Sequence, residues 1–207
     1  MEIKDRIIEE TSRLLVVKSC RLITMDEIAN NLGISKRTIY EQFTDKSSLL
    51  EECFNYHFDM AIKEVSDIAK ESDNSLISVM RVLKLASESI QAVKYEHIED
   101  LKKFYPKIYQ KTFEQHIAFQ KILRNKLLQE ALDEGLILED TSLDLLNSLI
   151  HLNLFYCSRN EFINENSNHS SSEIVAMNIF IILRGVSTYK GIEIIDNYKN
   201  ILFKNNI

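Results

Sequence analysis

The sequence predicts an all-α fold. Among 207 residues there are one proline and four glycines, so the chain lacks the breakers that mark the turns of β-sandwiches and barrels. These glycines are also too few for a Rossmann or phosphate-binding loop. Apolar residues make up 45% of the chain and recur at spacings of three and four residues, the period of an amphipathic helix. We therefore expect about nine to ten helices.

The first two helices are predicted near the N-terminus. A helical apolar stripe covers residues 3–18 and ends near Ser19–Cys20. Thr24 and Glu27 form a capping box, in which the Thr24 hydroxyl accepts from the Glu27 N–H and the Glu27 side chain reaches back. Gly33 is suited to the left-handed residue that closes this second helix.

The third and fourth helices follow after a tight turn. Ser35 is a good N-cap for a short helix over residues 36–43, with Ile39 and Phe43 on its inner face. Asp45 can cap a fourth helix, whose apolar pattern continues to about Lys70.

The rest of the chain is predicted to form a larger helical body. After a polar break at residues 71–75, further helices are predicted at about 76–93, 108–134, 142–158, 172–186 and 192–203. Residues 95–106, which contain several aromatics and Pro106, are predicted to be irregular. The polar residues 164–172 are predicted to form a loop.

Charge is distributed unevenly along the chain. The net charge is −6 and the mean hydropathy is −0.15. Residues 1–50 carry eight basic and eight acidic side chains, and residues 51–207 carry 17 basic and 23 acidic ones. The acidic total argues against a nonspecific nucleic-acid coater. A neutral N-terminal part on an acidic body suggests two separate roles.

Cysteine and histidine usage indicates neither disulfides nor metal. The three cysteines, Cys20, Cys53 and Cys157, are widely spaced and form no C-x-x-C, and Cys53 and His57 have no third ligand nearby. No signal peptide and no apolar stretch of about 18 residues is present. We expect a cytoplasmic protein without cofactor, metal or membrane contact.

The motif with functional content is residues 24–50, TMDEIANNLGISKRTIYEQFTDKSSLL. Two short helices joined by a turn at residues 33–35 have the organisation of a helix-turn-helix. Apolar residues hold the pair together: Ile28, Leu32, Ile34, Ile39 and Phe43. This leaves Lys36, Arg37, Tyr40 and Glu41 outside, as expected of side chains that enter a DNA groove.

The segment resembles the DNA-binding domain of the Tet repressor (TetR) family of bacterial regulators. The matching elements are Thr24-Met-Asp-Glu-Ile-Ala29, Gly33-Ile-Ser35, Thr38-Ile-Tyr40, Phe43-x-x-Lys46 and Leu49-Leu50, with Ile7-Ile8 and Leu14-Leu15 upstream. The match covers about residues 3–58. It implies a three-helix DNA-binding domain at 1–48, joined through helix four to an effector-binding and dimerisation bundle at 49–207.

The resemblance also implies which residues contact DNA. Thr38 and Tyr40 match phosphate-contacting hydroxyls, and Lys46 matches a phosphate clamp at a helix N-terminus. Base edges are expected to be read by Lys36, Arg37 and Gln42. An Arg37–guanine pair would contribute about 1–3 kcal/mol of discrimination. Glu41 either accepts from a cytosine amino group or faces solvent.

The body is expected to dimerise, because two-fold dimers read two DNA half-sites. The helices at 142–158 and 172–186 carry more apolar residues than one buried face needs: Leu143, Leu146, Leu149, Ile150, Leu154, Ile174, Met177, Ile179, Phe180, Ile181 and Ile182. The resemblance implies that these helices form a four-helix interface between protomers. A monomeric bundle core is the alternative.

A ligand pocket for a small molecule is implied by the resemblance as well. The candidate pocket residues are Tyr95, His97, Phe104, Tyr105, Tyr109, Phe113, His116 and Phe155. Such an aromatic group at helical spacing also fits ordinary core packing. The sequence does not choose between a drug, a fatty acid and a metabolite as effector.

The function expected from these observations is that of a DNA-binding transcriptional regulator. The resemblance implies a repressor that binds a palindromic operator as a homodimer and is released by an effector. No G-x-S-x-G, H-E-x-x-H, P-loop or paired-carboxylate motif suggests an enzyme. The alternative is a helical protein-interaction module whose helix-turn-helix no longer binds DNA.

Overall fold

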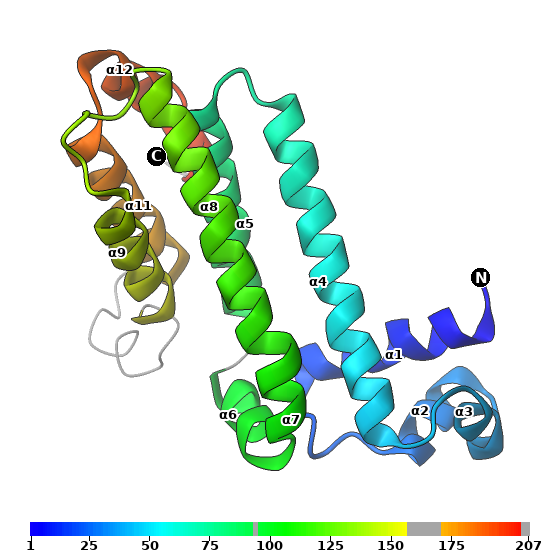
Figure 1. The fold of residues 1–207 in the computed structure, drawn as a ribbon. Coiled ribbons are helices and arrows are strands. Elements are labelled where there is room, and N and C mark those ends of the chain that lie inside the picture. The colour runs from blue at the N-terminus through cyan, green and yellow to red at the C-terminus, as the bar shows by residue number, and fades with distance from the viewer. Residues whose placement is uncertain (93–94, 157–170, 204–207) are drawn as a thin grey trace. The chain divides into compact units, whose positions relative to one another are not determined.

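The computed structural model describes residues 1–92, 95–156 and 171–203 (Figure 1). Within these ranges the regular elements are helices, and the β-structure is one isolated bridge between Ile137 and Ser187. The all-α prediction is confirmed. No helix in the described ranges has the length and apolar character needed to span a membrane.

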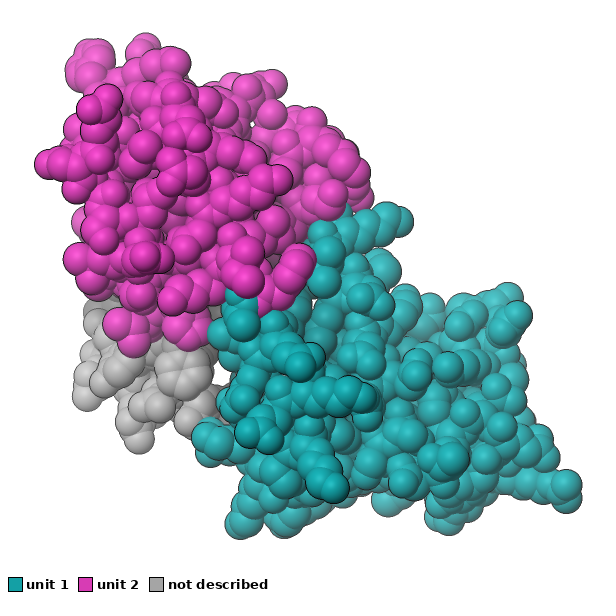
Figure 2. All heavy atoms as spheres, viewed as in Figure 1, with its two compact units in different colours: residues 1–63, 93–118 teal, residues 64–92, 119–207 magenta. Residues whose placement is uncertain are grey.

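The chain divides into two compact units, coloured separately in Figure 2. The first contains residues 1–63 and 93–118, and the second contains residues 64–92 and 119–207. The boundary predicted after residue 48 separates a DNA-binding part from an effector-binding part. The two compact units do not test it, so it stays a prediction.

The N-terminal helices have the predicted order and caps. They are α1 (Ile3–Val17), α2 (Met25–Leu32), α3 (Lys36–Gln42) and α4 (Lys46–Glu71). The side chains of Thr24, Ser35 and Asp45 each accept a hydrogen bond from the backbone N–H three residues later, at 3.2, 3.1 and 2.8 Å. Gly33 closes α2 in the left-handed region, with φ +65°.

One half of the predicted capping box is wrong. The Glu27 carboxylate does not reach back to the start of α2 but accepts a hydrogen bond from the Lys18 ammonium. A nearby cation attracts a carboxylate more strongly than a neutral backbone N–H does. The box therefore becomes a simple Thr24 cap plus an ion pair that joins α2 to the end of α1.

A dense apolar cluster holds the helix-turn-helix. It includes Ile7, Ile8, Leu14, Ile23, Met25, Ile28, Ala29, Ile39, Phe43, Leu49 and Cys53, with Leu32 and Ile34 packed at its edge. The five apolar residues predicted to join the two short helices all belong to this cluster or its edge. Burying Ile39 fixes which face of α3 is turned outward.

Residues 95–106 are mostly helical, which corrects the prediction of an irregular segment. They form α6 (Tyr95–Phe104), followed by a break at Tyr105 (φ −134°, ψ 56°) and a single turn α7 (Pro106–Ile108). Pro106 occupies the first position of α7, where a missing N–H costs no helical hydrogen bond. The proline thus starts a turn and does not disorder the segment before it.

The predicted helix 108–134 is also interrupted. Residues Tyr109–Glu114 form a π-helical stretch, and α8 then runs over Gln115–Asp133. Such π-helical turns insert extra backbone into an otherwise regular helix, which apolar spacing alone does not reveal. Gly135, with φ +67°, follows the end of α8.

The second unit is built on the predicted long helices. Its further elements are α5 (Ser75–Ala92), α9 (Leu143–Tyr156), α11 (Ser171–Val186), α12 (Tyr189–Asn197) and a 3₁₀ turn (Lys199–Ile201). The predicted last helix at 192–203 is wrong at both ends. It begins at Tyr189 because Thr188 caps it, and it ends at Asn197. Residues 164–170 of the predicted loop lie outside the described residues.

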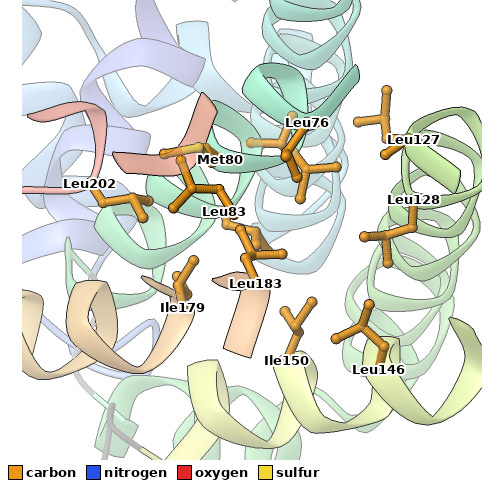
Figure 3. Packing of buried hydrophobic residues seen from close by; sticks show 14 of the residues in the cluster. Leu76, Met80, Leu83, Leu127, Leu128, Leu146, Ile150, Ile179, Leu183 and Leu202 are labelled. Atoms are coloured by element: carbon orange, nitrogen blue, oxygen red, sulfur yellow. The ribbon is translucent and has the colours of Figure 1, made fainter. Parts of the chain in front are cut away.

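The core of the second unit contains side chains from α4, α5, α8, α9, α11 and α12, several of which are labelled in Figure 3. Leu76, Met80 and Leu83 of α5 pack in one cluster with residues of α8, α9 and α11: Leu127, Leu128, Leu146, Ile150, Ile179 and Leu183. Because these buried apolar side chains form one contact cluster, the unit has its own hydrophobic core.

A close backbone approach at Gly191 gives a stability prediction. A Cβ added there would lie 2.1 Å from the Leu136 carbonyl oxygen, whereas one added at Gly185 would meet nothing within 4 Å. We expect Gly191→Ala to lower the free energy of unfolding by about 1–3 kcal/mol through overpacking. Gly185→Ala, within α11, should raise it by about 0.5–1 kcal/mol. Thermal denaturation of both variants checks this; equal effects would contradict it.

Candidate nucleic-acid interface

Helix α3 lies beside α2 (Figure 1). Ile39 is fully buried, and the Ser35 cap sets where the helix begins. With the inner face fixed, the residues predicted to lie outside are exposed, namely Lys36, Arg37, Tyr40 and Glu41, and so is Gln42. Tyr40 keeps 47% of its surface exposed, which is unusual for an aromatic side chain that merely packs. This face therefore collects cationic, hydroxyl and amide groups on a rigid support.

Both cations of α3 are held by carboxylates. The Lys36 ammonium donates to Asp26 of α2 at 2.8 Å, and this hydrogen bond to the Asp26 carboxylate raises the pKa of Lys36. The Arg37 guanidinium donates to Glu41 at 3.1 Å, one turn along the same helix. Glu41 therefore has a third role that sequence reasoning did not consider, namely to orient Arg37. Both pairs are exposed and can open at small cost.

Thr38 is tied to the start of α3. Its hydroxyl lies 2.9 Å from that of Ser35, and its N–H donates to the same Ser35 oxygen. The residue is half-buried, whereas Arg37 and Tyr40 are exposed. Thr38 therefore has less freedom than Tyr40 to adjust to a partner.

Lys46 begins α4 and is less accessible than a simple surface clamp. Its ammonium donates to the Arg21 carbonyl at 3.3 Å and lies 5.7 Å from the centre of the Tyr105 ring. Burial lowers the pKa of Lys46. Arg21 was missed at the sequence level, because its contact depends on how the loop before α2 folds.

The aromatics of α6 and the following turns contact cations in the first unit. Arg21 lies over the Phe104 ring at 5.1 Å, and Lys102 lies over the Tyr109 ring at 5.7 Å. Such cation–π pairs hold side chains in place while leaving the charge near solvent. Phe104, Tyr105 and Tyr109, predicted as pocket candidates, are therefore brought together with cations of the same unit.

The other pocket candidates are placed as follows. His116 stacks on Phe58 of α4, with ring centroids 3.9 Å apart, and burial lowers its pKa. His97 lies on α6 and its Nδ1 is buried without a hydrogen-bond partner in the structure. The side chains of Tyr95, Phe113 and Phe155 lie outside the described residues. In the described part of the chain no cluster of His, Cys, Asp or Glu is arranged for a metal ion.

Helices α9 and α11 each expose an apolar stripe. Leu145, Leu149 and Leu152 of α9, and Met177 and Ile181 of α11, are between 45% and 61% exposed. The spacing of three and four residues places each set on one helix face. The sequence had singled out Leu149, Met177 and Ile181 but not Leu145 or Leu152. Of the other predicted residues, those buried in the monomer core are Leu146, Ile150, Leu154 and Ile179.

A family model matches the N-terminal part of the chain. Residues 7–53 match the model described as bacterial regulatory proteins, tetR family. The uncharacterized HTH-type transcriptional regulator YerO of Bacillus subtilis (strain 168) is 34% identical over 70 residues. That alignment covers 34% of this chain and 24% of YerO, so the match spans about a quarter of that relative.

Solved structures resemble nearly the whole chain. A protein from Saccharomonospora viridis in complex with choline has a TM-score of 0.77 at 15% identity, covering 89% of this chain and 97% of that one. A TetR-family regulator from Agrobacterium tumefaciens scores 0.69 at 11% identity, with 89% and 97% covered. FadR from Bacillus subtilis in complex with stearoyl-CoA scores 0.65 at 13% identity, with 87% and 98% covered. At these identities the likeness establishes the fold.

Proposed function

We propose that this chain is a repressor of the TetR family, whose model matches residues 7–53, and that it binds a palindromic operator as a homodimer and leaves it when a small-molecule effector binds. The observation that carries the proposal is the outward face of α3. Arg37 and Tyr40 project from a helix whose opposite side is locked by Ile39. The absence of catalytic motifs from the sequence agrees with a non-enzymatic family.

Each side chain of this surface has a role suited to its chemistry. Lys36, Arg37 and Gln42 offer donors that match base edges in the major groove. Thr38, Tyr40 and Lys46 offer hydroxyl and ammonium donors to phosphates, which fix the register of α3 on the duplex. The carboxylates of Asp26 and Glu41 hold the two α3 cations until phosphates or bases replace them.

The exposed stripes of α9 and α11 support the homodimer. Contiguous exposed apolar residues on a water-soluble helix pair favour association with a matching surface. A two-fold axis brings the same two helices from each protomer together, so that both stripes are covered at once. One recognition helix per protomer then reaches one of two half-sites about 34–36 Å apart.

Effector release requires that a ligand bind one state better than the other. Helix α4 begins at Lys46, and its residues 64–71 belong to the second unit. We take it as the element through which effector binding changes the separation of the two recognition helices. The aromatic pocket candidates predicted from the sequence remain part of this proposal.

The phosphate role of Lys46 gives a salt-dependence prediction. Lys46→Gln should weaken binding about tenfold to every DNA sequence alike and reduce the salt slope by about one per protomer, because one fewer counterion is released. Lys70→Gln is the matched control, since Lys70 lies at the other end of α4 and is exposed beside Asp67. Fluorescence anisotropy over a salt series measures both. A loss confined to one sequence would contradict a phosphate contact.

A further inference from the structure

The second unit contains a buried arginine without an acidic partner. Arg124 of α8 is only 4% exposed, and its Nε donates to Oδ1 of Asn147 on α9, which is itself fully buried. Among the residues that the structure describes, no carboxylate forms an ion pair with Arg124. Buried guanidinium groups are normally paired, because removing an isolated charge from water is costly.

Asn147 cannot supply the missing charge, and its orientation is fixed. Its Nδ2 donates to the Lys121 carbonyl at 2.9 Å and to the Asn125 side-chain oxygen at 2.6 Å. Since both acceptors need the amide nitrogen, Oδ1 must face Arg124. Asn147 therefore acts as a positioning residue: it holds the guanidinium through Nε and leaves the four N–H groups of the two Nη atoms for another acceptor.

Arg124 and Lys121 both bring positive charge close to His151 of α9. Burial lowers the pKa of Arg124 to about 10, which still leaves the group charged near neutral pH. Burial and the positive charges of Arg124 and Lys121 lower the pKa of His151. These groups add no negative charge that could compensate Arg124.

Aliphatic core residues lie close in sequence to Arg124 and Asn147 on the same two helices. Figure 3 shows Leu128 of α8 beside Leu146 and Ile150 of α9, the helices that carry Arg124 and Asn147. A molecule that reaches the guanidinium from within this unit would therefore meet hydrocarbon side chains along most of its length. Such surroundings favour a ligand that is charged at one end and apolar along the rest of its length.

We propose that Arg124 binds the anionic head group, a carboxylate or a phosphate, of an otherwise apolar effector. The two Nη atoms can form paired hydrogen bonds to two oxygens of such a group, the arrangement in which arginine binds anions best. This inference rests on the proposed function, in which the second unit binds the effector. It also separates this chain from the choline-bound S. viridis neighbour, because choline is a cation that Arg124 would repel.

The test uses four probes with one chain length: decanoate, decyl phosphate, decanol and decyltrimethylammonium. Calorimetry and thermal shift are measured on the full chain and on Arg124→Met, which keeps an unbranched apolar stem. Arg184→Met is the matched control, since Arg184 is exposed and paired with Asp196. We expect one or both anions to bind the wild type and Arg184→Met at least about tenfold more tightly than decanol or the cation, and Arg124→Met to lose that preference.

Arg124→Gln is the second variant in case Arg124→Met does not fold, because glutamine can still donate to Asn147. The proposal would be overturned if the anionic probes do not bind the wild type, or if they bind it no more tightly than decanol does. So would an anion preference that survives in a folded Arg124 variant. Comparing decanoate with decyl phosphate decides between the two head groups.

The same samples are tested for operator binding without probe. If wild type and Arg124→Met bind the operator equally but no anion preference exists, this inference fails and the proposed function stands. If the wild type binds no operator, the proposed function itself fails, whatever the probes show.

Discussion

Arg37→Ala is expected to weaken operator binding at least about thirtyfold and to relax the base preference at one position of each half-site. A lost bidentate base contact costs about 1–3 kcal/mol, and a two-fold dimer loses it twice. The fold should persist, because the Arg37 side chain is 88% exposed and its exposed pair with Glu41 adds little to stability. Tyr40→Ala should weaken binding by a similar factor, but equally for all sequences.

The matched control for Arg37 is Arg13→Ala. Arg13 is also exposed and also pairs with a carboxylate of its own helix, Glu10 at 2.7 Å, but it lies on α1 outside the proposed contact surface. Competition binding with operator variants measures affinity and base preference, and circular dichroism checks folding. An equal loss in the Arg13 variant would mean that only net charge matters and would refute base reading by Arg37.

Leu149→Glu is expected to convert the homodimer into monomers and to reduce operator affinity by at least about a hundredfold. The substitution places a carboxylate at the centre of the α9 stripe between Leu145 and Leu152, and symmetry places a second one opposite or nearby. Burying such charges without partners costs more than most interfaces can offset. A monomer then holds a single half-site and loses the gain from two linked contacts.

Tyr189→Glu provides the control for dimerisation. Tyr189 is 86% exposed on α12, away from the α9 and α11 stripes in sequence, and the change adds the same charge. Sedimentation velocity over a concentration series reports the assembly state of each variant. A Leu149→Glu protein that remains dimeric would show that the two apolar stripes are not the interface.

The helix-turn-helix could be predicted almost to the residue because its signals are local. A cap such as Ser35, a left-handed glycine such as Gly33 and a buried Ile39 act within a few residues of one another. The long apolar helices of the second unit were equally clear, since their spacing persists over many turns. In each case one short stretch of sequence contains the whole physical cause.

The missed features depend on residues that are distant in sequence. The Arg21 carbonyl meets Lys46 only after the loop before α2 has folded, and Arg124 meets Asn147 only when α8 packs on α9. The end of α12 and the π-helical stretch before α8 likewise have no spacing signal. Whether Leu149 is exposed while Ile150 is buried also follows from packing, because both are apolar residues on one helix.

The most direct test is a selection of genomic fragments by the purified wild-type protein at roughly 0.15 M salt, followed by affinity measurement on the enriched sequence. We expect a palindromic site bound with nanomolar or tighter affinity, well above the micromolar or weaker level of nonspecific binding, and bound by Arg13→Ala but much less by Arg37→Ala. Enrichment of no sequence, with only weak binding that both variants share, would contradict the account and favour a protein-interaction module.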